Sequence, residues 1–475
     1  MQTRLFINGK WIETGTLLPV RNPFTGAQIA QVSLGDEGTL DAAIAAARDA
    51  FPRTRSVPAH ERSALLQRIA HAIEEMREEF AQTIVAESGK PITYAEAEVA
   101  RAVCTFTIAA EEARRWSGAG EVLALDAMPA GVGHTGFSRR FPIGVISAIT
   151  PFNFPLNLVA HKVAPCLATG NTMVVKPAAK TPLTALLLAQ VLAAADVPAG
   201  QMNFVICSNE HAANLVTDER VAMLSFTGGP DVGWRLKELA GKKRVCLELG
   251  GNAGVIVHED ADLAGAVPMI AAGGFGNAGQ SCISVQRIFV QENIYADFKA
   301  QFLAHIREEV KTGDPRDRAT VVGPMITAEA LAKTRTLIAS AVAAGGRIVL
   351  GGEVHKHCLE ATVIEDIPLS HEACTGELFA PVVTLHRYSD FDEALRLVND
   401  SRFGLQAGVF TRDIGRALSA FETLEVGGVL INQVPTWRVE NMPYGGIKDS
   451  GFGREGLRYA MEEMTEVRTL IIRNG

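Results

Sequence analysis

The stretch Gly144-Val145-Ile146-Ser147-Ala148-Ile149 starts an alternation of strands and helices that decides the fold. Its apolar residues predict a buried strand, and the apolar spacing over 156–168 predicts the helix that follows. A second strand is expected at 172–176, and further strands at 203–206 and 223–227. Strands that alternate with helices indicate a parallel sheet covered on both faces, so we predict an α/β fold.

Other elements are expected on both sides of this region. An Asn8-Gly9 turn predicts a hairpin over 6–12, and a second alternating series runs from 253–257 to 429–432. The apolar run 183–195 predicts a buried helix with Thr181 as its N-cap and Pro182 at its first position. Apolar spacing predicts further helices over 41–51, 60–88 and 92–116. The glycine-rich segment 118–136 predicts an excursion in extended conformation.

Size and composition restrict the class of protein. The 475 residues exceed what one core usually holds, so two or three domains are expected. The hydrophobic fraction of 47% and the net charge of −8 are typical of a globular protein that binds neither nucleic acid nor membranes. The start of the chain lacks the apolar stretch of a signal peptide, and the run 183–195 is too short to span a bilayer.

The seven cysteines are irregularly spaced and form no CxxC motif. An odd number of cysteines in a long chain favours reduced thiols and a cytoplasmic location. Histidines are scattered, and His355-Lys356-His357 is interpreted as a surface loop, so no metal site is predicted.

Three side chains provide the parts needed for covalent chemistry on a carbonyl group. Cys282 ends the small, flexible run Gly276-Asn277-Ala278-Gly279-Gln280-Ser281, which suits a nucleophile that a substrate approaches closely. Glu248 lies among apolar residues and glycines, and partial burial there would raise its pKa into the range of a general base. Asn153 stands between two prolines and offers a side-chain amide as an oxyanion donor.

Two strand ends could meet a nucleotide, because ligands of open parallel sheets lie at the carboxyl ends of the strands. Lys176 ends one strand, and the glycine-rich run 226–233 leads from another strand into a helix whose amides could meet a pyrophosphate. An ordinary strand-to-helix turn explains this run equally well. Two GxGxxG matches are rejected: 131–136 leads into a strand, and 274–279 lies in a predicted helical stretch.

Together these residues resemble the aldehyde dehydrogenase superfamily, the NAD(P)-dependent enzymes that oxidise aldehydes to acids. The resemblance covers nearly the whole chain, and its motifs occur in the family's order: Pro151-Phe152-Asn153-Phe154-Pro155, Leu247-Glu248-Leu249-Gly250-Gly251, Gly279-Gln280-Ser281-Cys282, Glu377-Leu378-Phe379-Ala380-Pro381, and Pro443-Tyr444-Gly445-Gly446 with Ser450-Gly451-Phe452-Gly453-Arg454-Glu455.

The resemblance implies a role for each of these positions. Cys282 would be the nucleophile, Glu248 the general base and Asn153 the oxyanion donor. Lys176 would hold the adenosine ribose and Gly229 the pyrophosphate. Glu377 would bind the nicotinamide ribose, with Phe379 beside it. The other positions expected at the NAD or NADP site are Ile149, Thr150, Pro151, Phe152, Ala179, Lys180, Thr227, Gly228, Leu249 and Gly250.

The implied architecture has three parts. A Rossmann-type cofactor domain would comprise 1–116 and 138–247, and an α/β catalytic domain would comprise 248–441. A small β oligomerisation arm with the tail would comprise 117–137 and 450–475. Such arms pair between subunits, so a homodimer or homotetramer is expected.

The implied chemistry begins with attack of the Cys282 thiolate on the aldehyde carbon. The thiohemiacetal gives up hydride and becomes a thioester, which water activated by Glu248 hydrolyses. Three alternatives remain open: acyl transfer to coenzyme A, succinate semialdehyde as substrate, and a non-catalytic role. The glutamate base favours water over coenzyme A.

Two departures from the family pattern concern specificity. Where NAD-specific members carry a glutamate that repels a 2′-phosphate, this chain has Ala179, followed by Lys180, which predicts use of NADP as well as NAD. Lys180 could equally be a solvated surface charge.

The expected substrate pocket is cationic. His161 and Arg438 occupy positions where aromatic residues are common, and Arg101 lies on a helix expected to line the same funnel, with Ser281 beside the nucleophile. Arg287 is a weaker candidate. Converging cations would select a short aldehyde that carries an anion or hydroxyls. The pattern resembles the branch with lactaldehyde, phosphonoacetaldehyde, sulfolactaldehyde and non-phosphorylating glyceraldehyde-3-phosphate dehydrogenases. Alternatively, His161 is a histidine whose hydrogen bonds are satisfied within its helix, and Arg101 is a surface charge on its helix.

Overall fold

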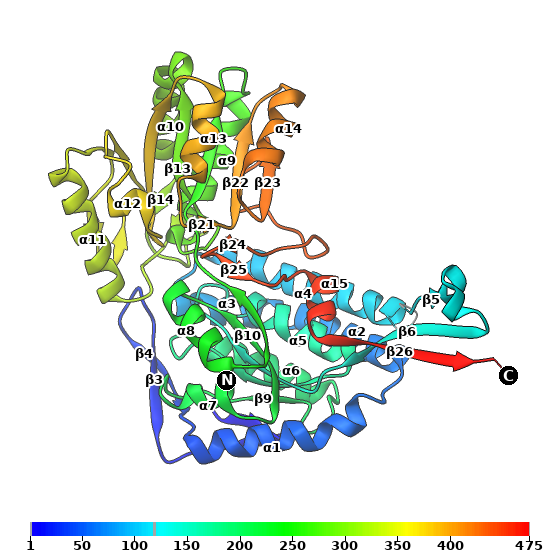
Figure 1. The fold of residues 1–475 in the computed structure, drawn as a ribbon. Helices are drawn as coiled ribbons and strands as arrows, with labels where there is room; N and C mark the ends of the chain where they lie inside the picture. Colours follow the sequence, from blue (N-terminus) through cyan, green and yellow to red (C-terminus); the bar gives the residue numbers. More distant parts are fainter. Residues whose placement is uncertain (1, 117–119, 475) are drawn as a thin grey trace.

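Two large β-sheets organise the chain in the computed structural model, which describes residues 2–116 and 120–474 (Figure 1). The first sheet has eight strands in the order β2-β1-β9-β8-β7-β10-β11-β25. Its five central strands, β9 to β11, are parallel. The flanking strands β1 and β25 run antiparallel to them, and β2 pairs antiparallel with β1. The strands are β1 Leu5–Ile7, β2 Lys10–Ile12, β7 Val145–Ile149, β8 Thr172–Lys176, β9 Met202–Phe204, β10 Val221–Thr227, β11 Arg244–Glu248 and β25 Gly451–Phe452.

Helices cover this first sheet on both faces, as the sequence predicted (Figure 1). The central strand β7 is buried along its whole length, which explains why its sequence is a continuous apolar run. The helices of this part are α1 Glu37–Thr54, α2 Ala59–Glu75, α3 Arg77–Ser88, α4 Ile92–Trp116, α5 Asn157–Thr169, α6 Leu183–Ala194, α7 Asn214–Thr217, α8 Pro230–Ala240 and α15 Leu457–Glu463.

The second sheet has seven strands in the order β16-β19-β20-β13-β12-β22-β23, all parallel except the edge strand β16. Its strands are β12 Ala253–Val257, β13 Val285–Gln291, β16 Arg347–Leu350, β19 Thr362–Glu365, β20 Val382–Tyr388, β22 Gln406–Phe410 and β23 Gly428–Ile431. Its helices are α9 Leu263–Phe275, α10 Tyr295–Glu309, α11 Ala328–Ala343, α12 Glu372–Thr375, α13 Phe391–Asn399 and α14 Ile414–Thr423.

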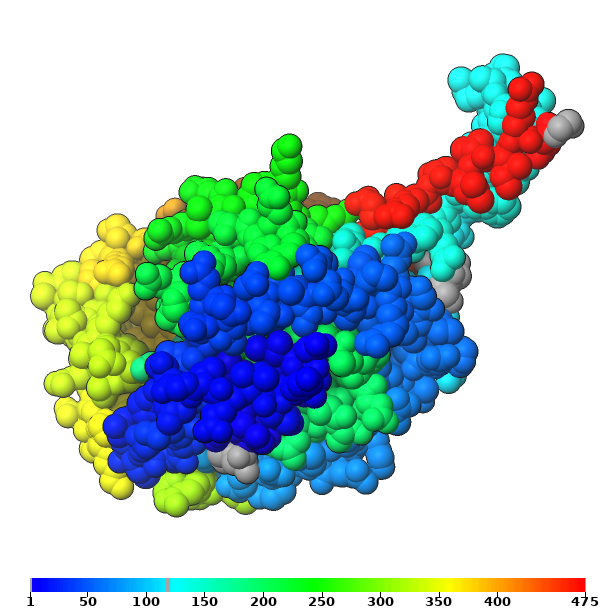
Figure 2. Space-filling view, turned by 90° about the horizontal axis from the view of Figure 1, so that it is seen from below, coloured from blue at the N-terminus to red at the C-terminus, as the bar shows by residue number. Residues whose placement is uncertain are grey.

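A narrow arm projects from the body, as Figure 2 shows for its β26 and β6 strands. It is a three-stranded antiparallel sheet of β5 Val122–Leu123, β6 His134–Pro142 and β26 Thr465–Arg473. Short pairs of strands complete the fold: β3 Leu17–Arg21 with β4 Gln28–Ser33, β14 Lys311–Thr312 with β15 Thr320–Val322, β17 Val354–His355 with β18 Cys358–Leu359, and β21 Phe403–Gly404 with β24 Ile447–Lys448.

The C-terminal segment divides differently from the expected 450–475 tail. Its first residues form β25, which pairs with β11 in the first sheet, and only β26 belongs to the arm. The arm strand β6 also continues to Pro142, beyond the expected end at 137. The outer boundaries of the predicted domains stay a prediction.

Local predictions from the N-terminal part had mixed outcomes. The hairpin over 6–12 is confirmed, with Asn8 and Gly9 at φ 51° and 72°, as a two-residue turn of this kind requires. The single helix predicted over 60–88 is wrong, because Met76 leaves helical geometry (φ −98°, ψ 18°) and separates α2 from α3. The sequence carries no glycine or proline there to mark the break.

The predicted N-cap of α6 is also wrong. Pro182 precedes the helix, and the hydroxyl oxygen of Thr181 is buried without a hydrogen-bond partner among the described residues. The carboxylate of Glu87 replaces it: Oε2 accepts from the backbone N–H of Leu183 at 2.7 Å, and Oε1 accepts from that of Thr184 at 2.9 Å. A carboxylate at a helix N-terminus accepts hydrogen bonds from the free N–H groups and interacts favourably with the positive end of the helix dipole. This cap therefore joins α3 to α6.

Candidate active site

A cavity of about 370 Å³ lies where the two sheets meet, and several predicted site residues line it. Cys282, Asn153 and Ser281 lie on its wall together with Arg101, His161 and Arg438. The remaining lining residues are Lys90, Tyr94, Ala97, Glu98, Phe154, Asn157, Leu158, Met269, Ala272, Gly273, Gly276, Asn277, Ile283, Val434, Thr436 and Tyr444.

The loop before Cys282 is not the helical stretch that the sequence predicted. Helix α9 ends at Phe275, and Asn277 and Ala278 then adopt left-handed backbone conformations, with φ of 53° and 55°. Such a conformation costs about 1 kcal/mol or more in a residue other than glycine, so surrounding contacts must maintain it. A Cβ on Gly279 would stand 2.1 Å from the carbonyl oxygen of Ala380, so this glycine allows the close packing that presents Cys282.

The thiol of Cys282 is half-buried, with Sγ 3.5 Å from the hydroxyl oxygen of Tyr444. Burial raises the pKa of this thiol to about 12, and the nearby carboxyl groups of Glu377 and Glu248 act in the same direction. The hydrogen bond from Tyr444 and the charge of Arg438 oppose that rise.

Asn153 lies in the Pro151–Pro155 turn between β7 and α5, which holds its side chain over the loop of the nucleophile. Its Nδ2 donates to the carbonyl oxygen of Gln280 at 3.1 Å. Its Oδ1 is buried and has no hydrogen-bond partner among the described residues. The amide is therefore positioned beside the cysteine, as the sequence suggested.

Glu248 ends β11, and its backbone is fixed because its carbonyl oxygen accepts from the N–H of Gly228 at 3.0 Å. Both carboxyl oxygens are buried without a hydrogen-bond partner in the described part of the chain. Burial raises the pKa of this carboxyl well above its usual value, and the charge of Glu455 adds to the rise. A raised pKa makes this carboxylate a stronger base toward a proton on water or substrate.

The residues predicted for the cofactor meet at one edge of the first sheet. Ile149 pairs with Lys176 in the strand register, and Thr227 pairs with Glu248, so the four strand ends are neighbours. Thr150 follows directly, and its backbone N–H donates to the carbonyl oxygen of Lys176 at 3.1 Å. The remaining predicted positions at this edge are Pro151, Phe152, Gly228, Gly229, Leu249 and Gly250.

This edge has features that fit a dinucleotide. The hydroxyl groups of Thr150 and Thr227 are buried without partners among the described residues, and a ligand could satisfy them. Gly229 is the N-cap of α8, and a Cβ there would meet nothing within 4 Å, so the helix N-terminus is open to a pyrophosphate. Burial lowers the pKa of Lys176, whose Nζ lies 3.3 Å from Oδ1 of Asn209.

Glu377 and Phe379 reach the same edge from the second sheet. Oε1 of Glu377 accepts from the backbone N–H of Gly251 at 3.0 Å, and a Cβ on Gly250 would stand 2.5 Å from Oε2. Burial raises the pKa of Glu377 to about 7. Phe379 has a left-handed backbone (φ 50°) and packs edge-on against Phe152, with 5.8 Å between ring centroids.

Ala179 and Lys180 line a different cleft of about 410 Å³, together with Arg21 and Thr327. Lys180 is exposed, whereas Ala179 is half-buried. The position expected to carry the glutamate of NAD-specific members thus faces this cleft beyond the end of β8.

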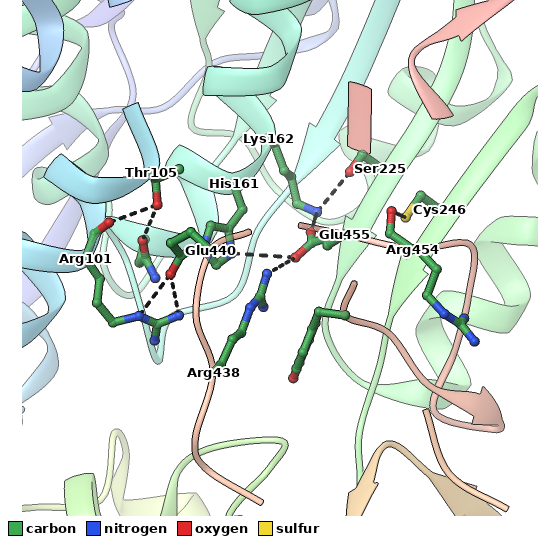
Figure 3. A network of polar contacts seen from close by, with 12 residues as sticks. Arg101, Thr105, His161, Lys162, Ser225, Cys246, Arg438, Glu440, Arg454 and Glu455 are labelled. Carbon is green, nitrogen blue, oxygen red and sulfur yellow. Dashed lines mark hydrogen bonds and ion pairs between the residues drawn. The ribbon is translucent and has the colours of Figure 1, made fainter. Parts of the chain in front are cut away.

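The three predicted substrate-binding cations are not free, which corrects the expectation of an unpaired cationic funnel (Figure 3). Arg101 donates to Oε1 of Glu440 from Nε and Nη2, at 3.1 and 2.8 Å. Nε2 of His161 lies 2.6 Å from Oε2 of Glu440, and Nη2 of Arg438 lies 3.5 Å from Oε2 of Glu455. These cations therefore belong to a buried network with two carboxylates.

Sequence reasoning assigned no role to Glu440 or Glu455. Both are 3% exposed, and Glu455 also accepts from Nζ of Lys162 at 3.1 Å. Burial opposes their ionisation, but His161 and Arg438 hold the pKa of Glu440 well below its usual value, and Lys162 and His161 do the same for Glu455. Glu455 stood in a quoted motif, and Glu440 follows Arg438 by two residues, so the available signal was an acidic residue close to an expected cation.

Arg287, the weaker candidate, does not line the cavity. It is buried and donates to the carbonyl oxygens of Asn252, Leu397 and Val398 at 3.2, 2.9 and 3.1 Å. Its role is to tie β13 to the end of α13, and it has no part in the candidate site.

Residues 2–116 and 120–474 contain no group of three or more His, Cys, Asp or Glu side chains placed to hold a metal ion. Within the same ranges, every helix is too short or too polar to cross a bilayer.

Known proteins resemble this chain along almost its full length. The model of the aldehyde dehydrogenase family matches residues 11–470. A 3-sulfolactaldehyde dehydrogenase from Priestia aryabhattai is 40% identical over 472 residues, which cover 99% of this chain and 98% of the relative.

Solved structures agree with this assignment. Aldehyde dehydrogenase 21 from Physcomitrella patens, in complex with the reaction product succinate, is 43% identical with a TM-score of 0.97, and the match covers 99% of this chain and 98% of that one. The glyceraldehyde-3-phosphate dehydrogenase GapN from Methanocaldococcus jannaschii, complexed with NADP, is 38% identical with a TM-score of 0.92, covering 97% and 100%. Betaine aldehyde dehydrogenase from Staphylococcus aureus, in complex with NAD+, is 30% identical with a TM-score of 0.95, covering 100% and 95%.

The chain belongs to the aldehyde dehydrogenase family, as its motifs predicted. It is an oxidoreductase that oxidises aldehydes to acids with NAD or NADP, and its similarity to the sulfolactaldehyde and GapN enzymes agrees with the branch named from the sequence.

Proposed function

We propose that the chain oxidises a small aldehyde bearing an anionic or hydroxyl group, through a thioester on Cys282. The observation that carries the proposal is that Cys282 and Asn153 share one cavity of about 370 Å³ with Arg101, His161 and Arg438. Charged donors at the wall of this cavity suit a polar substituent on the aldehyde.

The charges around the cavity leave an excess of positive charge. Lys90, Arg101, Lys162 and Arg438 contribute four positive charges, whereas Glu98, Glu440 and Glu455 contribute three negative charges, so one positive charge remains when Glu248 is protonated. The side chain of Arg101 is 33% exposed, so it can still reach a ligand while it donates to Glu440. A carboxylate, sulfonate or phosphate would be attracted to such a site.

The chain's own residues account for the covalent chemistry. The Cys282 sulfur adds to the aldehyde carbon, and the resulting oxyanion accepts hydrogen bonds from Nδ2 of Asn153 and the backbone N–H of Cys282. NAD or NADP, when bound at the edge formed by Thr150, Thr227 and Gly229, supplies the hydride acceptor. Loss of hydride from the former aldehyde carbon leaves a thioester on Cys282.

Hydrolysis of the thioester needs a base, and we assign this role to Glu248. Its raised pKa lets it take a proton from water that attacks the thioester carbon, and Cys282 then leaves as a thiolate. A buried base in the site supports water over coenzyme A as acceptor. Product analysis with and without coenzyme A distinguishes the two.

A panel of short aldehydes, matched as anionic and neutral pairs and assayed with each cofactor, tests the proposal. Cys282→Ala should abolish activity, and Arg101→Met should raise KM for the anionic member of each pair by about tenfold with little effect on the neutral one. Arg115→Met, an exposed arginine on the same helix α4, is the matched control. Equal effects of Arg101→Met on both members would exclude the anion preference.

Succinate semialdehyde is the second candidate substrate. Aldehyde dehydrogenase 21 from Physcomitrella patens was solved with succinate, the corresponding acid. The same panel separates the candidates if it includes succinate semialdehyde beside hydroxylated three-carbon aldehydes.

We further propose a homodimer or homotetramer built through the arm. Leu470, Ile471 and Ile472 of β26 are about half exposed, and a free strand edge with apolar side chains favours pairing with another chain. We propose that the first sheet serves the cofactor and the second provides the nucleophile. A cytoplasmic location would suit the seven free cysteines.

A further inference from the structure

The phenol of Tyr444 is the polar group in contact with the sulfur of Cys282, at 3.5 Å. Its ring is 5% exposed, so water cannot easily replace this contact. The backbone of Tyr444 is fixed by two hydrogen bonds to Glu455, one in each direction, at 3.0 and 2.7 Å. The hydroxyl is therefore held at the sulfur by main-chain pairing and not by a flexible loop.

Arg438 lies over the ring of this phenol. Its guanidinium carbon is 3.7 Å from the centroid of the Tyr444 ring, and Nη2 is 3.5 Å from the carboxylate of Glu455. Glu455 therefore contacts Tyr444 through its backbone and Arg438 through its carboxylate, and so positions both. A cation over an aromatic face withdraws electron density, which strengthens the phenol as a hydrogen-bond donor.

The surroundings of Cys282 make such a donor necessary. Burial disfavours the thiolate, and the charges of Glu377 and Glu248 disfavour it further. The favourable contributions come from Tyr444 and Arg438. Burial raises the pKa of Tyr444 well above its usual value, so the phenol keeps its own proton and can donate it in a hydrogen bond to a negatively charged sulfur.

We propose that Tyr444 is a catalytic residue that stabilises the Cys282 thiolate through an O–H···S⁻ hydrogen bond, and that Arg438 and Glu455 are the positioning residues that hold it there. The proton of the Cys282 thiol passes to the buffer, and Tyr444 retains its own. The inference rests on the proposed function, which assigns Cys282 as the nucleophile.

The test measures the thiol itself. Alkylation of Cys282 by iodoacetamide, followed by mass spectrometry of the peptide that contains it, gives the thiolate fraction as a function of pH without turnover. Tyr444→Phe keeps the ring under Arg438 and removes only the hydroxyl. We expect its alkylation midpoint to rise by about one pH unit, with about tenfold slower alkylation near neutral pH.

Tyr94→Phe is the matched control, because Tyr94 lines the same cavity but makes no hydrogen bond to Cys282 among the described residues. Its alkylation midpoint should not move. If Tyr444→Phe proves unstable, 3-fluorotyrosine at position 444 keeps the hydroxyl and makes it a stronger donor, so the midpoint should fall.

Two different failures can be told apart. If the Tyr444→Phe protein is as stable as the parent protein and has the same alkylation profile, the role of Tyr444 is overturned while Cys282 remains the nucleophile. Full aldehyde oxidation by Cys282→Ala would instead overturn the proposed function, whatever the alkylation profile shows.

Discussion

Glu440 is bound by His161 and Arg101 at once: Oε2 lies 2.6 Å from Nε2 of His161, and Oε1 accepts from two nitrogen atoms of Arg101. The carboxylate comes from the segment after β23, His161 from α5 and Arg101 from α4, so one side chain links three parts of the chain. This link has consequences for stability that solution measurements can check.

Glu440→Gln should lower the free energy of unfolding by about 3 kcal/mol, because it leaves Arg101 and the buried His161 without their carboxylate partner. Urea unfolding followed by circular dichroism measures the loss. Glu425→Gln is the control: Glu425 pairs with Lys448 at 2.6 Å, but its side chain is 59% exposed, so the loss there should stay below about 1 kcal/mol. Equal losses in the two variants would contradict a special role for the buried pair.

The same carboxylate should make stability depend on pH in acid. His161 and the arginines outweigh burial and hold the pKa of Glu440 below its ordinary 4.5. Its stabilising contribution is therefore complete above pH 4.5 and is lost as the pH falls toward the lower folded-state pKa. Between about pH 5 and 3, Glu440→Gln should lose less stability than the parent protein does. Parallel curves of unfolding free energy against pH would argue against this linkage.

Glu87→Ala removes the cap of α6 and should cost about 2 kcal/mol of stability, because two buried N–H groups lose their acceptor. Gln82→Ala, an exposed position on the same helix α3, should change stability by less than about 0.5 kcal/mol. Thermal unfolding of both variants provides the measurement. A loss for Glu87→Ala as small as that of the control would mean that Thr181 or water can cap the helix.

Gly445→Ala should impair release of the acid more than hydride transfer. A Cβ at this position would stand 2.9 Å from Oε1 of Glu248, so the carboxyl group must move away from the site. In stopped-flow assays we expect a normal burst of reduced cofactor followed by a steady state slower by about a hundredfold. Gly26→Ala, at φ +73° with nothing within 4 Å of the new Cβ, introduces a positive-φ alanine without a steric contact and should leave both phases unchanged. Loss of the burst itself would show that Glu248 or its neighbours act before the thioester forms.

Ala179→Glu should lower kcat/KM for NADP relative to NAD by about tenfold or more, because the added carboxylate would repel a 2′-phosphate near the end of β8. Lys180→Ala should move the ratio in the same direction but less, since Lys180 is exposed. A parent enzyme that already prefers NAD strongly would defeat the prediction of dual cofactor use.

The sequence predicted the features that depend on neighbouring residues. The strand 145–149, the turn at Asn8-Gly9 and the cysteine motif are local patterns, and each predicts structure through burial or backbone preference alone. The partners of Arg101 and Arg438 could not be predicted in this way, because Glu440 lies 339 residues from Arg101. The same holds for Glu87, which lies 96 residues before the helix that it caps.

Backbone strain escaped prediction for a different reason. Ala278 is a good helix former, yet contacts of the Cys282 loop with the second sheet impose a left-handed conformation on it. The cations were correctly placed at the cavity, but a list of residue types could not reveal that they were already paired. Charge balance in a buried site is a property of the folded packing and not of any single motif.

The segment that contains Arg438, Tyr444 and Glu455 is synthesised after both large sheets are nearly complete, although β25 inserts beside Glu248 at the edge of the first. During translation, a nascent chain could therefore assemble its nucleotide-binding edge while the cysteine still lacked its phenol and its cation. A ribosome-bound intermediate of this kind would hold cofactor without turning over aldehyde, and the enzyme would become active only when its last strands reach their places.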